Sequence, residues 1–351
     1  MPAPGASVPL LAWAGLAAAL QPAAAAGAEG RARGFRYLNR LSAGPGVVRS
    51  PLPAETLQGT SLPSHFDWRD IGGRSYVVPT YNQYVPGECG SCWAHASAAA
   101  LSDRIKRLRN ASFPDVEISR QVLLNCLSGW AGPRNGCCTC DGGDPYQAYS
   151  YIYEHGIPDE TCAAYVAAVQ SCTPRHVCRG LDGSARKAYP KYGVVEFGAY
   201  FCGNLTKKDM ADFGFDVPRC EVAHGPAVLP YTERVLQSEI FARGPVACCM
   251  AVTDEFLALG AHEVYTESES RHWCDHIVSL SGWGETALGK KYWIARNSFG
   301  SYWGDQGWFR IERGTNNAGI EQYCAWAVPR DDWSNATSRP GASQAPATLV
   351  V

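Results

Sequence analysis

Apolar positions recur along the chain at two different spacings, and the spacing changes near its middle. Residues 91–109 carry small and apolar side chains at helical intervals, and residues 119–126 and 144–155 do the same. Asp144 is suited to cap the N-terminus of the third segment, and Gly156 is suited to end it. These patterns predict three helices in the first half of the chain.

The second half instead contains short runs of β-branched and aromatic residues, separated by glycines and charged turns. The runs are GPVACCMAVT, HIVSLSGWG, KKYWIARNS and GWFRIERG. Runs of this length and composition are typical of strands. A helical first half and a strand-rich second half predict an α+β protein of two lobes, with a site in the cleft where they meet. Residues 163–231 show no pattern that assigns them to either class.

The two ends of the sequence differ from the part between them. Residues 8–20 form a short apolar run followed by small residues, which predicts a signal peptide over residues 1–26. Residues 27–61 are rich in Gly, Pro, Ala and Arg and are interpreted as a short pro-segment, and residues 62–330 as the folded domain. Residues 331–351 are low in complexity and are predicted to be a disordered tail. No apolar stretch has the length of a membrane span.

Composition limits which cellular compartment and which binding partners are expected. The chain has 351 residues and a formal net charge of −2, which gives no reason to expect nucleic acid or an anionic membrane as a partner. The basic cluster at residues 104–109 is interpreted as a solvated helix face. Fifteen cysteines suit several disulfides and at least one free thiol in a secretory compartment. Three glycosylation sequons agree with secretory entry, at Asn110, Asn204 and Asn335.

The segment CGSCWAHAS raises the question of what Cys92 does. Together with Cys89 it has the spacing of a zinc half-site, and CCTC at residues 137–140 contains further cysteines. Disulfides explain that cluster more simply in a secretory chain, so no metal site is predicted. A redox role needs a thioredoxin-like βαβ context, which the sequence lacks. Burial as half of a disulfide and activation as a nucleophile both stay open at this point.

A nucleophilic Cys92 requires two further groups. A thiol attacks as the thiolate, which a helix N-terminus and a neighbouring imidazolium stabilise. Cys92 opens the first predicted helix, so the histidine must come from elsewhere in the fold, with a third group to orient its ring. The candidates are His276, at the start of a predicted strand, and Asn297, where the next strand enters a loop rich in Gly and aromatic residues.

The strings CGSCW, DHIVSLSGWG and RNSFGSYWGDQGW, in that order, resemble the papain-like cysteine peptidases. The resemblance implies a papain-like α+β fold, with a helical left lobe, an antiparallel β-barrel-like right lobe and the active-site cleft between them. It implies Cys92 as the nucleophile and His276 as its base and acid. It implies Asn297 as the residue that orients His276, and Gln83 as a donor to the oxyanion. No cofactor is implied.

The resemblance also suggests substrate contacts and partners. Gly142 and Gly143 are expected to bind the backbone of an extended substrate, since the absence of side chains permits close approach. Tyr84, Phe299 and Trp303 are expected beside the cleft, where Phe299 replaces the tryptophan that covers the asparagine in the family. The expected partners are peptide or protein substrates and cystatin-like inhibitors. The expected form is a monomer in a lysosomal, vacuolar or extracellular compartment.

Four disulfides follow from the resemblance, and six cysteines are left without an expected role. The implied pairs are Cys89–Cys140, Cys126–Cys172, Cys162–Cys178 and Cys248–Cys324. The unassigned residues are Cys137, Cys138, Cys202, Cys220, Cys249 and Cys274.

An insertion between Gln83 and Cys92 is expected, from the resemblance, to favour trimming of substrates from the C-terminus. Tyr84-Val85-Pro86 resembles a short insertion in a carboxypeptidase branch of the family, which also has a short pro-segment. That branch carries a histidine in the insertion, thought to hold the terminal carboxylate, and this chain has Tyr84. It also has a pro-segment cysteine that blocks the nucleophile, whereas no cysteine here precedes Cys89.

Three alternatives to a carboxypeptidase stay open. They are a papain-like endopeptidase, a catalytically silent binding protein on the same scaffold, and an enzyme that transfers acyl groups to amines. His276 and Asn297 also lie farther from Cys92 than the roughly 130–150 positions typical of the family. Insertions such as residues 135–139 and 180–221 are expected to account for the difference.

Overall fold

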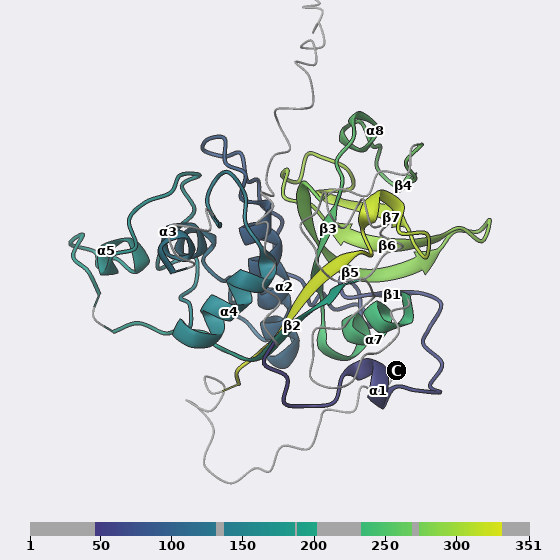
Figure 1. Ribbon diagram of the computed structural model, residues 1–351, viewed down its shortest axis with the longest axis horizontal. Coiled ribbons are helices and arrows are strands. Elements are labelled where there is room, and N and C mark those ends of the chain that lie inside the picture. Colours follow the sequence, from purple (N-terminus) through teal and green to yellow (C-terminus); the bar gives the residue numbers. More distant parts are fainter. Residues whose placement is uncertain (1–45, 131–136, 187, 202–232, 269–273, 332–351) are drawn as a thin grey trace, which may run out of the picture.

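The computed structural model describes residues 46–130, 137–186, 188–201, 233–268 and 274–331. They form two lobes on either side of the long helix α2 (Cys92–Leu108), as predicted (Figure 1). The left lobe contains α3 (Arg120–Trp130), α4 (Pro145–His155) and the one-turn α5 (Pro174–Val177). The right lobe contains most of the strands together with α7 (Glu233–Arg243), α8 (Asp254–Leu257) and the short helix η2 (Asn317–Gly319).

One sheet of eight strands runs through the right lobe and extends beneath the helices of the left lobe. Its spatial order is β2-β8-β3-β5-β6-β7-β4, with β1 paired to β5. The strands are β1 Phe66–Asp67, β2 Val194–Phe201, β3 Val246–Met250, β4 Val264–Tyr265, β5 His276–Glu285, β6 Lys291–Arg296, β7 Trp308–Glu312 and β8 Tyr323–Pro329. All pairs are antiparallel except β4–β7. Within the described residues β2 and β4 end the ladder without meeting, so the sheet is open and the expected barrel-like closure is wrong.

The central strands are buried on both faces, which separates two apolar cores. Side chains of successive strand residues point to opposite faces. In β3, Cys249 accordingly lies in the core shared with α2, α3 and α4, whereas Cys248 lies in the core beneath α7. At Gly282 of β5, a Cβ would stand 2.2 Å from the carbonyl oxygen of Phe66, so only glycine lets β1 pair this closely.

The three helices that the sequence predicts are present as α2, α3 and α4, although α3 extends four residues farther than expected, and α1 (Pro53–Thr56), α5, α7 and α8 were not predicted. The helix expected over residues 144–155 is α4, and the Asp144 side chain accepts a hydrogen bond from the Tyr146 N–H at 2.9 Å as its N-cap. Gly156 ends α4 with a φ of 64°, a conformation that glycine adopts without strain. None of the described helices is both long and apolar enough to cross a membrane.

Arg104, the first residue of the basic cluster in α2, is buried, so the interpretation of a solvated face is wrong at this residue, whereas Lys106, Arg107 and Arg109 are partly exposed. Arg104 is 1% exposed, and its Nη2 lies 2.9 Å from Oε1 of the fully buried Glu239 on α7. The same guanidinium donates to the carbonyl oxygens of Gly244, Pro245 and Ala327. Charged side chains are buried where partners satisfy them, and these partners lie far along the sequence.

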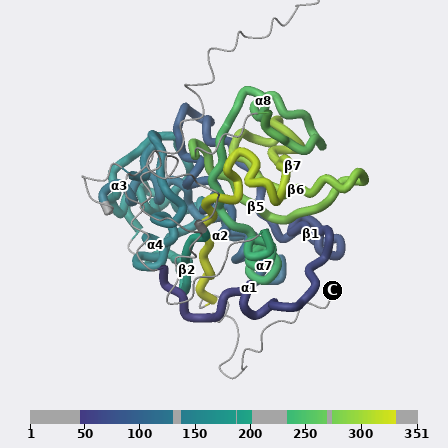
Figure 2. Tube along the Cα trace, turned by 45° about the vertical axis from the view of Figure 1, so that its right-hand side comes forward, coloured from purple at the N-terminus to yellow at the C-terminus, as the bar shows by residue number. Residues whose placement is uncertain are grey.

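Residues 46–61, the C-terminal part of the expected pro-segment, lie across both lobes. The Val47 carbonyl accepts from the Phe197 N–H of β2 at 3.0 Å, and Arg49 donates to the Tyr153 hydroxyl of α4 at 2.9 Å. Leu52 is 3% exposed in the core beneath α7. The next residues form α1 (Pro53–Thr56), which packs against α7 in both views (Figure 2). We name residues 46–61 the N-terminal strap.

Several segments and residues that have a predicted role lie outside the described residues. They are the signal peptide, residues 27–45 of the pro-segment, Asn204, Asn335, Cys202, Cys220 and the tail beyond residue 331.

We expect the buried Arg104 to make a large contribution to stability. Replacing Arg104 with Met leaves the Glu239 carboxylate buried without its closest charged partner, and breaking buried pairs this way typically costs about 3–5 kcal/mol. Urea unfolding of Arg104→Met measures the cost. Lys106→Met, in the same helix turn but less buried, is the control and should cost below about 1 kcal/mol. Equal losses in the two variants would contradict the role given to Arg104.

Candidate active site

Cys92 is the first residue of α2 and the only free cysteine among the described residues. The first N–H groups of a helix have no acceptor within it. The N–H groups of Trp93 and Ile277 are directed at the Cys92 sulfur, where they favour the thiolate. Ile277 belongs to β5, so the start of α2 and the start of β5 meet at this sulfur.

His276 and Asn297 come together at the adjacent ends of β5 and β6. The His276 Nε2 lies 2.8 Å from the Asn297 Oδ1, and both side chains are buried. Since an amide oxygen only accepts, Nε2 carries the proton in this pair. The Nδ1 atom of His276 has no hydrogen-bond partner among the described residues. This nitrogen is therefore available to exchange a proton with a thiol.

Burial opposes ionisation of both Cys92 and His276. It raises the pKa of the Cys92 thiol to about 12, against the opposing effect of the Ile277 and Trp93 N–H groups. It also lowers the pKa of His276 to about 4, although the hydrogen bond to Asn297 opposes this shift. A neutral thiol and a neutral imidazole are thus favoured in this closed site, and a thiolate–imidazolium pair depends on mutual attraction and on these hydrogen bonds.

Gln83 is fully buried and is held at both ends of its side chain. Its Oε1 accepts from the Ser298 hydroxyl at 2.6 Å, and its Nε2 donates to the Cys89 carbonyl at 3.2 Å. A primary amide has two N–H groups, so one is left for a ligand. The backbone N–H of Gln83 also donates to the Ser298 carbonyl at 2.8 Å, which connects Gln83 to the residue after Asn297.

The expected aromatic residues stack beside His276. The Phe299 ring centroid lies 5.0 Å from that of His276, and the Tyr84 ring lies 5.8 Å from Phe299 on the side of the insertion. Trp303 meets Phe299 edge-on at 5.6 Å and donates to the Leu257 carbonyl at 3.2 Å. His276 and Asn297 are 0% and 3% exposed beneath the ring of Phe299, so their hydrogen bond is shielded from water.

The two glycines expected to contact substrate have different surroundings. The Gly142 N–H and carbonyl both bond within a turn, to Thr139 and Cys138. Gly143 has a different constraint, because a Cβ there would stand 2.5 Å from the Trp93 indole. Neither backbone group of Gly143 bonds to another residue in the described part of the chain. Gly143 therefore has backbone groups to offer a ligand, and Gly142 does not.

The structure contains disulfides at Cys89–Cys140, Cys126–Cys172, Cys162–Cys178 and Cys248–Cys324, which are the four pairs implied by the resemblance. It also joins Cys137 to Cys138 and Cys249 to Cys274, which the sequence left unassigned.

Asn110 is exposed in the turn after α2. No group of three or more potential metal ligands occurs among the described residues.

Sequence reasoning missed three side chains that support the site. Ser298 holds the Gln83 amide, and Ser91 and Tyr165 form a hydrogen-bonded pair beside the start of α2. Ser298 was discoverable, since it follows Asn297 directly. Tyr165 was not, because it lies in the segment 163–231, to which no pattern assigned a structure.

Comparisons with known proteins agree with this geometry. The family model "Papain family cysteine protease" matches residues 62–328. Cathepsin Z of Onchocerca volvulus is 34% identical over 287 residues, which are 79% of this chain and 81% of the relative. Cathepsin B-like cysteine proteinase 4 of Caenorhabditis elegans is 30% identical over 260 residues, 69% of each chain. The strings CGSCWAHAS and HGIPDETC in this chain likewise resemble cathepsin X, which is another name for cathepsin Z.

Solved structures support the fold. Digestive procathepsin L2 proteinase from the larval midgut of Tenebrio molitor superposes with a TM-score of 0.60 at 23% identity, covering 85% of this chain and 78% of that chain. A structure from the mite allergens Blo t 1 and Der p 1 gives a TM-score of 0.56 at 26% identity, covering 80% and 75%. The papain-like fold implied by the sequence motifs is confirmed.

We expect Asn297 to determine the pH range in which His276 is charged. Asn297→Ala removes the hydrogen bond that favours the imidazolium, so the pKa of His276 should fall and the imidazolium should be lost at lower pH. The measurement is an NMR titration of the His276 ring. In Ser298→Ala, which leaves the His276 hydrogen bond intact, the titration midpoint of His276 should not move. An unchanged midpoint in Asn297→Ala would contradict the assignment.

Proposed function

The chain belongs to the papain family of cysteine proteases, and we propose that it hydrolyses peptide bonds through Cys92 and His276, with a preference for trimming the C-terminus. The observation that supports catalysis is that a free cysteine at a helix start lies against the N–H of Ile277, directly after His276, whose Nδ1 has no partner in the described structure. No metal or organic cofactor takes part in this proposal.

In the first half of the proposed reaction, the Cys92 thiolate attacks the carbonyl carbon of the scissile peptide bond. The oxygen becomes an oxyanion, which accepts hydrogen bonds from the second N–H of Gln83 and from the Cys92 backbone N–H. Protonated His276 then gives its Nδ1 proton to the leaving amine. The C–N bond breaks, and the acyl group stays on sulfur as a thioester.

In the second half, neutral His276 takes a proton from water at Nδ1, and the hydroxide attacks the thioester. Collapse of this intermediate releases the carboxylic acid and restores the thiolate beside the imidazolium. Asn297 keeps the imidazole ring in one orientation through both halves, because its Oδ1 accepts from Nε2 in the neutral and the charged state alike.

The preference for the C-terminus is supported by the position of the insertion. The Tyr84 ring packs against Phe299, and Phe299 packs against His276. The insertion therefore borders the side of the cleft that would hold the leaving group. Burial and the nearby Cys92 raise the pKa of Tyr84 well above its ordinary value. Tyr84 therefore stays neutral and contacts a carboxylate less strongly than a histidine cation would, since charge-assisted bonds are about twice as strong.

The disulfides support a secretory destination. Six join the described cysteines, and such bonds persist in oxidising compartments. We place the enzyme in a lysosomal or extracellular setting, acting on peptide or protein substrates.

We expect Cys92→Ser to fold normally and to lose nearly all peptidase activity. The serine hydroxyl has a far higher pKa than the thiol, so the imidazole cannot maintain it as an anion. His276→Ala should cost a comparable factor, since the two groups act as a unit. Turnover of a fluorogenic peptide measures both. Undiminished turnover in purified Cys92→Ser would refute the nucleophile and leave a silent binding protein as the better description.

We expect amidation of a substrate's C-terminus to slow wild-type cleavage modestly. Tyr84→His should widen the difference between free-acid and amidated peptides, most clearly below the pKa of the new histidine, where it is a cation. Val85→His, at a 60% exposed residue of the same insertion, is the matched control and should change the ratio less. If wild type and Tyr84→His cleave both peptides equally, Tyr84 only packs at the rim and an endopeptidase is favoured.

A further inference from the structure

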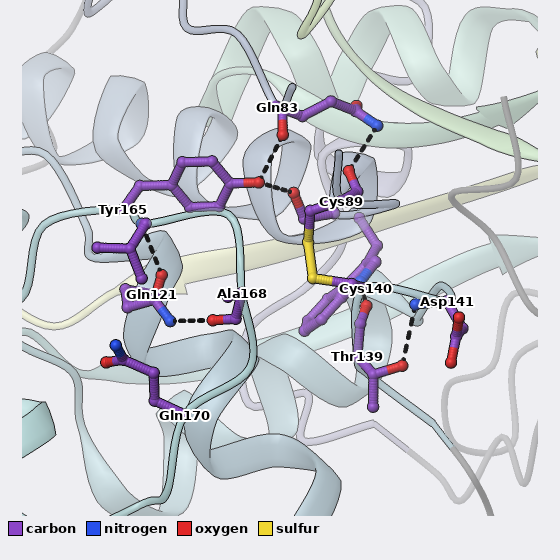
Figure 3. The surroundings of a disulfide bond; sticks show 12 residues. Gln83, Cys89, Gln121, Thr139, Cys140, Asp141, Tyr165, Ala168 and Gln170 are labelled. Carbon is purple, nitrogen blue, oxygen red and sulfur yellow. Dashed lines mark hydrogen bonds between the residues drawn. A yellow bond between two sulfur atoms is a disulfide. The ribbon is translucent and has the colours of Figure 1, made fainter. Parts of the chain in front are cut away.

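The Tyr165 hydroxyl lies beside the Gln83 backbone carbonyl (Figure 3) and beside the side chain of Ser91. It donates to the Gln83 backbone carbonyl at 2.7 Å and lies 2.6 Å from the Ser91 hydroxyl. Ser91 directly precedes Cys92 and is the N-cap residue of α2. A single side-chain atom therefore connects the residue expected to bind the oxyanion with the residue before the nucleophile.

The hydrogen bonds at Tyr165 have one consistent direction. A phenol has a single proton, and Tyr165 gives it to the Gln83 carbonyl, so the Ser91 hydroxyl must donate to the Tyr165 oxygen. Ser91 Oγ also lies 3.3 Å from Nδ1 of the buried His95. Burial raises the pKa of Tyr165 to about 12, so the hydroxyl keeps its proton through neutral and acidic pH.

Tyr165 itself is held firmly from the left lobe. Its N–H donates to the Glu160 carboxylate at 2.7 Å, and the next N–H, of Val166, donates to the Gln121 side chain at 2.9 Å. Gln121 in turn donates to the Ala168 carbonyl at 2.8 Å (Figure 3). The Tyr165 ring also meets the His95 ring edge-on at 4.7 Å. Because α3 carries Gln121, this network links the helices of the left lobe to the loop of residues 83–91.

The loop of residues 83–91 also has attachments that do not involve Tyr165. Gln83 bonds to Cys89 inside the loop and to Ser298 across the cleft, and Cys89 is joined to Cys140 beside the left-lobe core. None of these bonds holds the Gln83 backbone carbonyl or the Ser91 side chain. The bonds from Tyr165 to the Gln83 carbonyl and the Ser91 hydroxyl do so directly.

We propose that Tyr165 is a positioning residue of the oxyanion hole, which sets the Gln83 amide relative to the Cys92 N–H without touching the substrate. The inference rests on the proposed peptidase function. It predicts that loss of the hydroxyl weakens stabilisation of the tetrahedral intermediate and leaves substrate binding and thiolate formation unchanged.

The test is Tyr165→Phe, which removes the hydroxyl and keeps the ring against His95. We expect kcat to fall about 10-fold with KM unchanged, a fraction of the 10²–10³ typical for loss of an oxyanion-hole donor. A peptide aldehyde should bind about 10-fold more weakly, because its hemithioacetal oxygen takes the place of the oxyanion. Alkylation of Cys92 by iodoacetamide, which needs the thiolate and no oxyanion hole, should keep its rate and pH profile.

A double variant separates positioning from a general structural effect. Without the Gln83 amide, the position set by Tyr165 has no consequence, so Gln83→Ala/Tyr165→Phe should be no slower than Gln83→Ala alone. Tyr149→Phe is the matched control. This variant loses a buried tyrosine hydroxyl on α4 that donates to the Ser97 carbonyl of α2 at 3.3 Å, away from the cleft. It should keep the wild-type kcat.

Each outcome decides between the claims. Full activity in Tyr165→Phe, additive loss in the double variant, or slower alkylation of Cys92 would overturn the positioning role. If Tyr165→Phe fails to fold, Ser91→Ala cuts the other bond; since the Ser91 side chain makes no capping bond to α2, its effect on kcat and aldehyde affinity reports on the same link. A folded wild type that neither cleaves peptides nor takes up iodoacetamide would count against the proposed function itself.

Discussion

The position of α2 between the two lobes is the constraint on which the rest of the molecule depends. Two buried ion pairs fix this helix: Asp103 to Arg296 of β6 at 2.7 Å, and Arg104 to Glu239 of α7 at 2.9 Å. Consecutive residues thus bind two different elements of the right lobe. Arg296 directly precedes Asn297. The ion pair between Asp103 and Arg296, which holds α2 against β6, therefore also fixes the position of Asn297, the residue that orients His276. A helix that slipped by one residue would lose both pairs and displace Cys92.

The site combines this rigid scaffold with an unfavourable electrostatic environment. The same burial that excludes water from Cys92 and His276 favours their neutral forms. Fixed dipoles offset this: the N–H groups at the start of α2, the Ile277 N–H and the Asn297 amide. Because these groups are already oriented, no reorganisation is needed when charge develops. The hydrogen bonds of Tyr165 and Ser298 extend the same principle to Gln83, whose amide is directed from both lobes.

The sequence predicted the parts of the fold that depend on local pattern. The helix α4 with its Asp144 cap, the start of α2 and the strands β5 to β7 all carry their own periodicity or turn residues. Strands β2 and β8 were missed, because they are specified by pairing with each other across more than a hundred positions. Arg104 was misinterpreted as solvated for the same reason, since the sequence near it contains nothing that identifies Glu239 as its partner. The network around Tyr165 could not be predicted, because a lone tyrosine carries no signal of its role.

The N-terminal strap has a mechanical consequence for the cleft. It is bound to α4 through Tyr153 and to α7 through Arg243, which donates to the Ser50 hydroxyl at 2.9 Å and to the Pro51 carbonyl at 2.8 Å. A segment fixed to both lobes resists any rotation of one against the other. A chain that keeps residues 46–61 would therefore hold its two lobes together more rigidly than one that has lost them. The presence or absence of the strap would thus determine how freely the two lobes move relative to each other.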